Sequence, residues 1–226
     1  MRPLIIMNGE KIDWFHTVIR MLMYLAGVAV LALGMSLQTA SGLGVATLTC
    51  FATTLSMLTG KTLGFWITAT YVAYIVAQFT ILRREFQPRI LLELCFSTLI
   101  GGFTYFFMAV NPLHPAALPI QVETMLLSLA VTAFGVSLVV NMGVVPNAPD
   151  GLVQVIAEKI KRRFGDVKVV FDCSHVAVSL VLSLALMHNL GGFGVTTAIS
   201  ALFLDHVINI ANKLFAQRFV RAAFGK

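Results

Sequence analysis

Long, unbroken apolar runs are the feature that most limits what this 226-residue chain can fold into. Several of them reach about 20 residues, the length that an α-helix needs to cross the hydrocarbon core of a bilayer. Only 12% of the residues are charged, whereas an ordinary soluble domain has roughly 25%. The runs are continuous, unlike the alternating strands of a membrane β-barrel. The sequence therefore predicts an all-α polytopic membrane protein and excludes a soluble enzyme, a disordered chain and a secreted disulfide scaffold.

The apolar runs divide into six that are long enough to span a membrane and two that are shorter. The first short segment, 45–58, is rich in Thr and ends before Gly60 and Lys61. The second is an amphipathic helix predicted over 152–164, and it follows a stretch with Gly, Pro and Asn at 141–151. The predicted full spans are 17–37, 62–82, 90–110, 122–140, 169–187 and 193–212.

The basic residues gather between apolar runs and at the end of the chain, whose net charge is +6. This distribution is typical of cytoplasmic loops, and it argues against a nucleic-acid partner. With Arg83, Arg84 and the cluster 159–163 inside, we expect a multi-pass protein of the bacterial cytoplasmic membrane with both termini cytoplasmic. If 45–58 crossed completely, the next span would carry Arg83 and Arg84 outside. We therefore expect 45–58 to enter the membrane and return to the same side.

The two halves of the chain resemble each other at an offset of 101 residues. The order of elements also repeats: a long span, a short interrupted helix and two long spans. One interrupted segment enters from outside and the other from inside, so the sequence predicts a single membrane domain of two inverted three-span repeats, about 17–112 and 120–214, with a basic tail at 213–226. Generic use of glycine in membrane helices is the competing explanation. The matched residues are Ala32, Gly34, Ser36, Leu37, Gly42 and Gly64 with Ala133, Gly135, Ser137, Leu138, Gly143 and Gly165.

Interrupted segments in matching positions indicate a binding site near the bilayer midplane. Non-helical backbone at that depth is tolerated only where it is buried in protein or lines a cavity, and the N-terminus of a half-helix offers unpaired N–H groups. Asp150 is also predicted as the N-cap of the helix 152–164, and the small residues would equally suit close helix packing. The residues expected at the site are Ser41, Gly42, Gly44 and Thr47 in the first segment and Pro146, Asn147, Asp150 and Gly151 in the second.

Three segments of the chain are distinctive: GMSLQTASGLGVATLTCFATTLSMLTGKTLGFW (34–66), REFQPRILLELCFSTLIGG (84–102) and PDGLVQVIAEKIKRRFGDVKVVFD (149–172). With these segments the chain resembles the YczE/YyaS/YitT family of bacterial integral membrane proteins over nearly its whole length. The resemblance implies fold and location. The function of that family is largely unassigned, so no catalytic residues are carried over. Where the family often has a Ser-Pro or similar pair after the first Gly-rich turn, this chain has Val45, Ala46 and Thr47.

Carboxylates lie inside several of the predicted spans. Asp205 is near the middle of the last one, where a carboxylate is costly and usually faces a partner or a wet cavity. It shares a helix face with Asn209. A proton or cation relay, or a substrate anchor, is one interpretation, and a structural hydrogen bond to another helix is the other. Glu93 lies one turn from Arg89 and is interpreted as half of a salt bridge near the membrane surface.

Polar residues also recur at helical spacing in two predicted spans. Asp172 and His175 begin a stripe in the span 169–187. The simpler explanation for Asp172 is an ion pair near the membrane surface, where Lys168 is adjacent, or a contact with Arg162. Tyr74 and Gln78 belong to a second stripe, which lines a cavity or holds helices together. The predicted substrate or ion path consists of Asp205, Asn209, Asp172, His175, Tyr74 and Gln78.

The chain has no HExxH, GxSxG, Walker or His/Cys metal-ligand pattern, so we predict that it is not an enzyme and uses no metal or cofactor. We expect a gradient-driven membrane transporter or facilitator of a small solute, with the bilayer and that solute as partners. The alternative is a non-transporting membrane scaffold or regulator whose polar stripes join helices and whose basic segments bind lipid or a partner. The sequence leaves the substrate and any homo-oligomer open.

Overall fold

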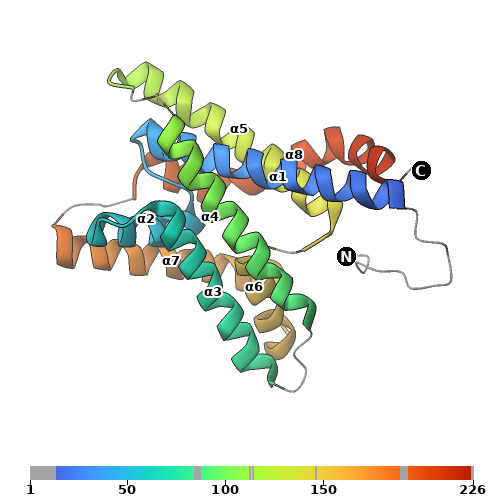
Figure 1. Ribbon diagram of the computed structural model, residues 1–226. Helices are drawn as coiled ribbons and strands as arrows, with labels where there is room; N and C mark the ends of the chain where they lie inside the picture. Colours follow the sequence, from blue (N-terminus) through green and yellow to red (C-terminus); the bar gives the residue numbers. More distant parts are fainter. Residues whose placement is uncertain are drawn as a thin grey trace.

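The structure is a computed structural model that describes residues 14–83, 88–111, 113, 115–145, 147–188 and 193–224 (Figure 1). Within these ranges the chain forms eight α-helices, one short 3-10 helix and no strands. The all-α class is therefore confirmed. The helices are α1 (Trp14–Ser41), α2 (Thr47–Thr59), α3 (Leu63–Leu82), η2 (Pro88–Leu91), α4 (Leu92–Val110), α5 (Leu118–Met142), α6 (Ala148–Ile160), α7 (Phe164–Met187) and α8 (Val195–Phe224).

Five of these helices, α1, α3, α4, α5 and α7, are long and apolar enough to cross a membrane. A sixth span is present if the two parts of α8, Val195–Ala201 and His206–Phe215, count as one; they are bent by 59° relative to each other. The chain thus has the helices of a multi-pass membrane protein. Helix α8 continues through the predicted basic tail as far as Phe224.

Helices α1 and α5 pack along each other and run in opposite directions (Figure 1). Gly34 packs against Thr132, and Gly135 packs against Leu31. A Cβ added to Gly135 would lie 2.6 Å from the Leu31 backbone nitrogen. Glycine at these positions lets the two backbones approach closely, as is common between membrane helices.

The two short helices, α2 and α6, have the same length and similar ends. Each has 13 residues, and α6 begins 101 residues after α2. Each follows an extended residue, Ala46 or Asn147, and each ends at a residue in the left-handed region, Gly60 or Lys161. Helix α2 packs against α7, and α6 packs against α3. The two short helices are therefore each held by a long helix from the other half of the chain.

The start of α6 differs from the prediction. The helix begins at Ala148, four residues before the predicted start, because Pro149 occupies its first turn, where proline needs no backbone donor. Asp150 is therefore inside the first turn and is not the N-cap. The N-cap is Asn147, whose side chain makes no capping hydrogen bond.

The outer faces of the long helices are apolar. Helix α7 is mostly exposed along its span, with Val169 and Val170 at 63% and 69% exposure. Apolar surface of this extent suits contact with lipid rather than water. The interior, by contrast, contains many of the polar residues of the spans, and these form the candidate site.

Candidate functional site

The predicted stripe on α3 faces the interior. Thr70, Tyr74 and Gln78 are all buried, and Gln78 is only 1% exposed. The stripe lies where α3 contacts α6 of the second half. A polar face turned inward on a candidate span is the arrangement expected of either a lined path or polar contacts between helices.

Glu93 joins this stripe from α4. Its Oε2 accepts a hydrogen bond from Gln78 Nε2 at 2.7 Å, and its side chain is 1% exposed. Glu93 is therefore buried inside the protein, and the side chain of its expected partner Arg89 lies outside the described residues, so the predicted salt bridge stays a prediction. Arg89 lies four residues before Glu93, and this spacing suggested an ion pair between them. In the structure Glu93 lies on the side of α4 that faces the interior.

The first turn of α6 rests directly on this pair. Gln78 Nε2 also lies 3.4 Å from the carbonyl oxygen of Ala148. A Cβ added to Gly151 would lie 2.8 Å from Glu93 Oε1 and 3.2 Å from Gln78 Nε2. Gly151 was predicted as part of the interrupted segment, and its lack of a side chain is what allows α6 to approach the carboxylate.

A second group of charges joins α6 to α7. Lys168 Nζ lies 2.9 Å from Asp150 Oδ1 and 3.7 Å from Asp172 Oδ2. All three side chains are partly buried. The simpler explanation for Asp172, an ion pair with Lys168, is thus what the structure shows. Lys168 was not expected to reach Asp150, since that contact depends on the turn between α6 and α7.

Tyr74 and His175 link α3 to α7. Tyr74 Oη and His175 Nε2 are 2.5 Å apart, and His175 Nδ1 lies 2.8 Å from the Phe171 carbonyl oxygen. A carbonyl can only accept, so Nδ1 carries a hydrogen and Nε2 of the neutral ring accepts from the Tyr74 hydroxyl. These two predicted path residues are therefore in direct contact.

The described side chains that hold the start of α2 are uncharged. Gln38 Oε1 accepts a hydrogen bond from the backbone N–H of Ala46 at 3.1 Å, just before the helix begins. Thr197 Oγ1 donates to the carbonyl of Val45 at 2.7 Å. Gln38 was not singled out from the sequence, because a Gln at the end of a long apolar span carries no signal of its own.

The backbone before α2 requires glycine at two predicted positions. Gly42 and Gly44 have φ values of +70° and +103°. A Cβ on Gly44 would also lie 2.7 Å from the backbone nitrogen of Gly194. The other two predicted residues of this segment, Ser41 and Thr47, are buried.

Asn209, another predicted site residue, is exposed on α8 and lies outside this group. Pro146 and the side chain of Asp205 lie outside the described residues, so the proposed role of Asp205 stays a prediction. Within the part of the chain that the structure describes, no group of three His, Cys, Asp or Glu side chains could hold a metal ion.

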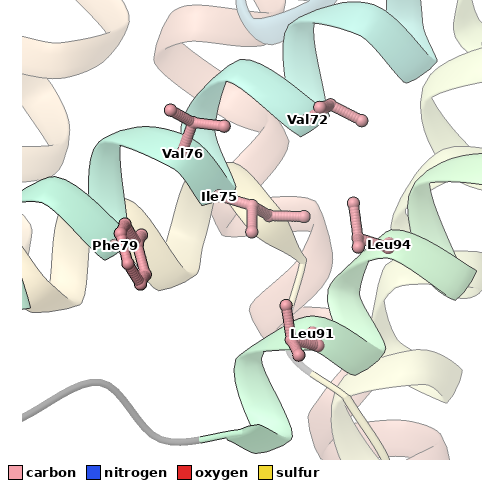
Figure 2. Close-up of a pocket in the computed structure, with 6 residues that line it drawn as sticks. All are labelled: Val72, Ile75, Val76, Phe79, Leu91 and Leu94. Atoms are coloured by element: carbon pink, nitrogen blue, oxygen red, sulfur yellow. The ribbon is translucent and has the colours of Figure 1, made fainter.

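Two surface cavities accompany the α3–α4 pair. The first has a volume of about 270 Å³ and an entirely apolar lining of Val72, Ile75, Val76, Phe79, Leu91 and Leu94, which Figure 2 shows on α3, η2 and α4. The second, of about 260 Å³, is lined by residues of α2, α3 and α4 that include Ser56, Thr62 and Tyr105. Neither is lined by the Gln78–Glu93 pair.

With this geometry in view, the comparison with known families becomes informative. A model described as a family of unknown function, DUF6198, matches residues 18–213. The chain belongs to the DUF6198 family. The DUF6198 match includes both short helices and every buried polar residue described above. The resemblance to the YczE/YyaS/YitT family stays a prediction, with which membership of DUF6198 does not conflict. No curated protein and no solved structure matches the chain.

Proposed function

We propose that this DUF6198 protein is a membrane transporter or facilitator of a small solute, built from two inverted three-span repeats. The observation that carries the proposal is that contacts recur at the offset of 101 residues. Gly34 against Thr132 corresponds to Gly135 against Leu31. Antiparallel packing of α1 and α5 gives this exchange of partners on its own, so the contacts outside that helix pair carry more weight.

Two polar contacts follow the same relation. Asn111 Nδ2 lies 3.3 Å from Ser36 Oγ, and Asn212 Oδ1 lies 2.6 Å from Ser137 Oγ. Each pair joins the end of a repeat to its first long helix. Because these two polar contacts are separated by the same offset, they support a repeat that extends along the chain. They do not depend only on the place where α1 and α5 cross.

The Tyr74–His175 hydrogen bond supports the same symmetry. These residues are 101 positions apart, so they occupy equivalent places on α3 and α7. Two equivalent residues touch each other when they lie on the axis that relates the repeats. The axis would exchange α1 with the antiparallel α5, so it would lie perpendicular to both helices. For helices that span a bilayer, such an axis lies in the membrane plane and defines an inverted repeat.

The polar interior supports transport over a purely structural role. Ionisable groups are expensive inside a membrane and usually mark a substrate or ion path. Here they gather where α6 meets α3, α4 and α7, next to the backbone break that precedes α6. The proposed site extends from this group past Tyr74 and His175 to the start of α2.

A native cysteine offers a test that needs no knowledge of the solute. Cys50 is fully buried at the start of α2, whereas Cys95 and Cys173 are exposed. In a Cys95→Ser/Cys173→Ser variant, Cys50 is the single thiol. We expect small membrane-impermeant methanethiosulfonate reagents to reach it from outside in intact cells and from inside in inverted vesicles.

The scaffold alternative gives the opposite result. In a closed, dry bundle Cys50 stays unmodified from both sides, while the same protein reacts after denaturation in detergent. That outcome would contradict transport and favour a non-transporting scaffold or regulator. Labelling from one side only would contradict passage through the site between the short helices.

A further inference from the structure

Glu93 is the best-buried charged residue that the structure describes. Within the described ranges it is the one Asp, Glu, Lys or Arg classed as buried, at 1% exposure. It lies in the first turn of α4, a candidate membrane span. The proposed path assigned from the sequence does not use it.

The described side chains that contact Glu93 offer hydrogen bonds but no positive charge. Gln78 of α3 donates to its Oε2, and the first turn of α6 covers its Oε1 at Gly151. Tyr24 of α1 lies close enough to interact electrostatically with it. The side chain of Arg89, one turn before Glu93, lies outside the described residues.

The available cation is bound elsewhere. Lys168 pairs with Asp150 and Asp172, and no described basic side chain forms an ion pair with Glu93. An ionised carboxylate that is buried without a cation is very unfavourable, so such a group takes up a proton instead. A neutral carboxyl group fits this position, since the Gln78 amide still hydrogen-bonds to it.

We propose that Glu93 is the proton carrier of the transport cycle. This inference rests on the proposed function and names its coupling ion. With α6 seated on Gln78, the Glu93 carboxyl group is neutral. When the first turn of α6 moves away, water reaches the group, its O–H bond breaks, the proton passes to water and a carboxylate remains. Reseating of α6 requires a proton to be taken up again, on the same or the opposite side.

Infrared spectroscopy of the full chain in liposomes tests the neutral state directly. A protonated carboxyl group has its own C=O stretching band, and ¹³C-labelled glutamate assigns it to Glu rather than Asp. We expect this band at neutral pH in the wild type and in Glu123→Gln, whose side chain is exposed on α5. We expect its loss in Glu93→Gln. A spectrum without the band at neutral pH, or with the band intact in Glu93→Gln, would overturn the proposal.

Two further variants test the link to α6. Gln78→Leu retains the carboxyl group and removes its hydrogen bond, so the band should remain and move to higher frequency. Gly151→Leu forces α6 away from Glu93, so the band should disappear at a lower pH than in the wild type. Gly102→Leu is the matched control, because a Cβ at Gly102 meets no atom within 4 Å. If Gly151→Leu and the wild type lose the band at the same pH, α6 does not control the proton and the carrier role is wrong.

The two proposals can fail separately. A Glu93 band together with an unreactive Cys50 would describe a buried structural acid in a scaffold, which contradicts transport. A Cys50 that reacts from both sides, without a Glu93 band, would support transport and contradict proton coupling through Glu93.

Discussion

The two short helices have closely similar backbones but rest on different chemistry. Helices α2 and α6 share their length, their extended entry and their left-handed exit. Around the start of α2 the described polar partners are the uncharged Gln38 and Thr197. Around the start of α6 they include Glu93 and Lys168. The two short helices therefore share their geometry, while among the described side chains the charged partners lie around the start of α6.

This difference suggests a division of roles within the proposed site. The α2 position offers hydroxyl, thiol and amide groups, which can bind a polar solute without a change of charge. The α6 position holds ionisable groups, which can couple movement to protons.

Replacement of glycine should show the largest difference in stability between the α2 and α6 positions. Gly44→Ala should lower the free energy of unfolding by about 3 kcal/mol, because the residue has φ +103° and its Cβ would meet the backbone of Gly194. Gly151→Ala should cost only about 1 kcal/mol, since its Cβ would meet the ends of two side chains that can move. Unfolding in detergent, followed by circular dichroism, measures both. Equal losses would show that the two positions are packed alike.

Removal of the cation at the α6 position should have the next largest effect. Lys168→Met leaves Asp150 and Asp172 without this ammonium group, and we expect a loss of about 2 kcal/mol, below the value for a fully buried pair because the group is partly exposed. Lys168→Arg should retain most of the stability. The same unfolding measurement checks this. A Lys168→Met protein as stable as the wild type would show that the ion pairs of Lys168 do not stabilise the fold.

The amide that supports α2 should matter slightly less. Gln38→Leu leaves the N–H of Ala46 buried without its acceptor, at a cost of about 1–2 kcal/mol. Gln121→Leu, a partly buried glutamine on α5 that contacts only a loop carbonyl, serves as the control. Hydrogen exchange at the start of α2 should accelerate in Gln38→Leu alone. Unchanged exchange would mean that Gln38 does not hold this helix.

The contact at the proposed axis should give the smallest effect. Tyr74→Phe retains the ring and removes the hydrogen bond to His175, so we expect a loss of about 1 kcal/mol. Tyr105→Phe, on the exposed face of α4, should be neutral. Thermal unfolding of the two variants compares them directly. A neutral Tyr74→Phe would show that the hydrogen bond contributes nothing to the joining of the halves.

Sequence periodicity was sufficient for the helical class, the short segments and the inward stripe of Tyr74 and Gln78. It failed where a residue's role depends on distant packing. Glu93 and Arg89 fit the spacing of a surface ion pair, and only the position of α6 reveals that Glu93 is buried. Asp150 fitted an N-cap because Pro149 suggested a break, whereas the proline lies inside the first turn. Gln38 became visible only through its contact with Ala46.

The most direct test of the account asks whether the two halves are inverted. Lys61 and Arg162 are exposed residues at equivalent positions, after α2 and after α6. In a chain whose Cys50, Cys95 and Cys173 are replaced, single cysteines at these two positions can be labelled with a membrane-impermeant maleimide. The account predicts that Lys61→Cys reacts in intact cells and that Arg162→Cys reacts only after permeabilisation. Labelling of both positions from the same side would contradict inverted repeats and the site proposed between them.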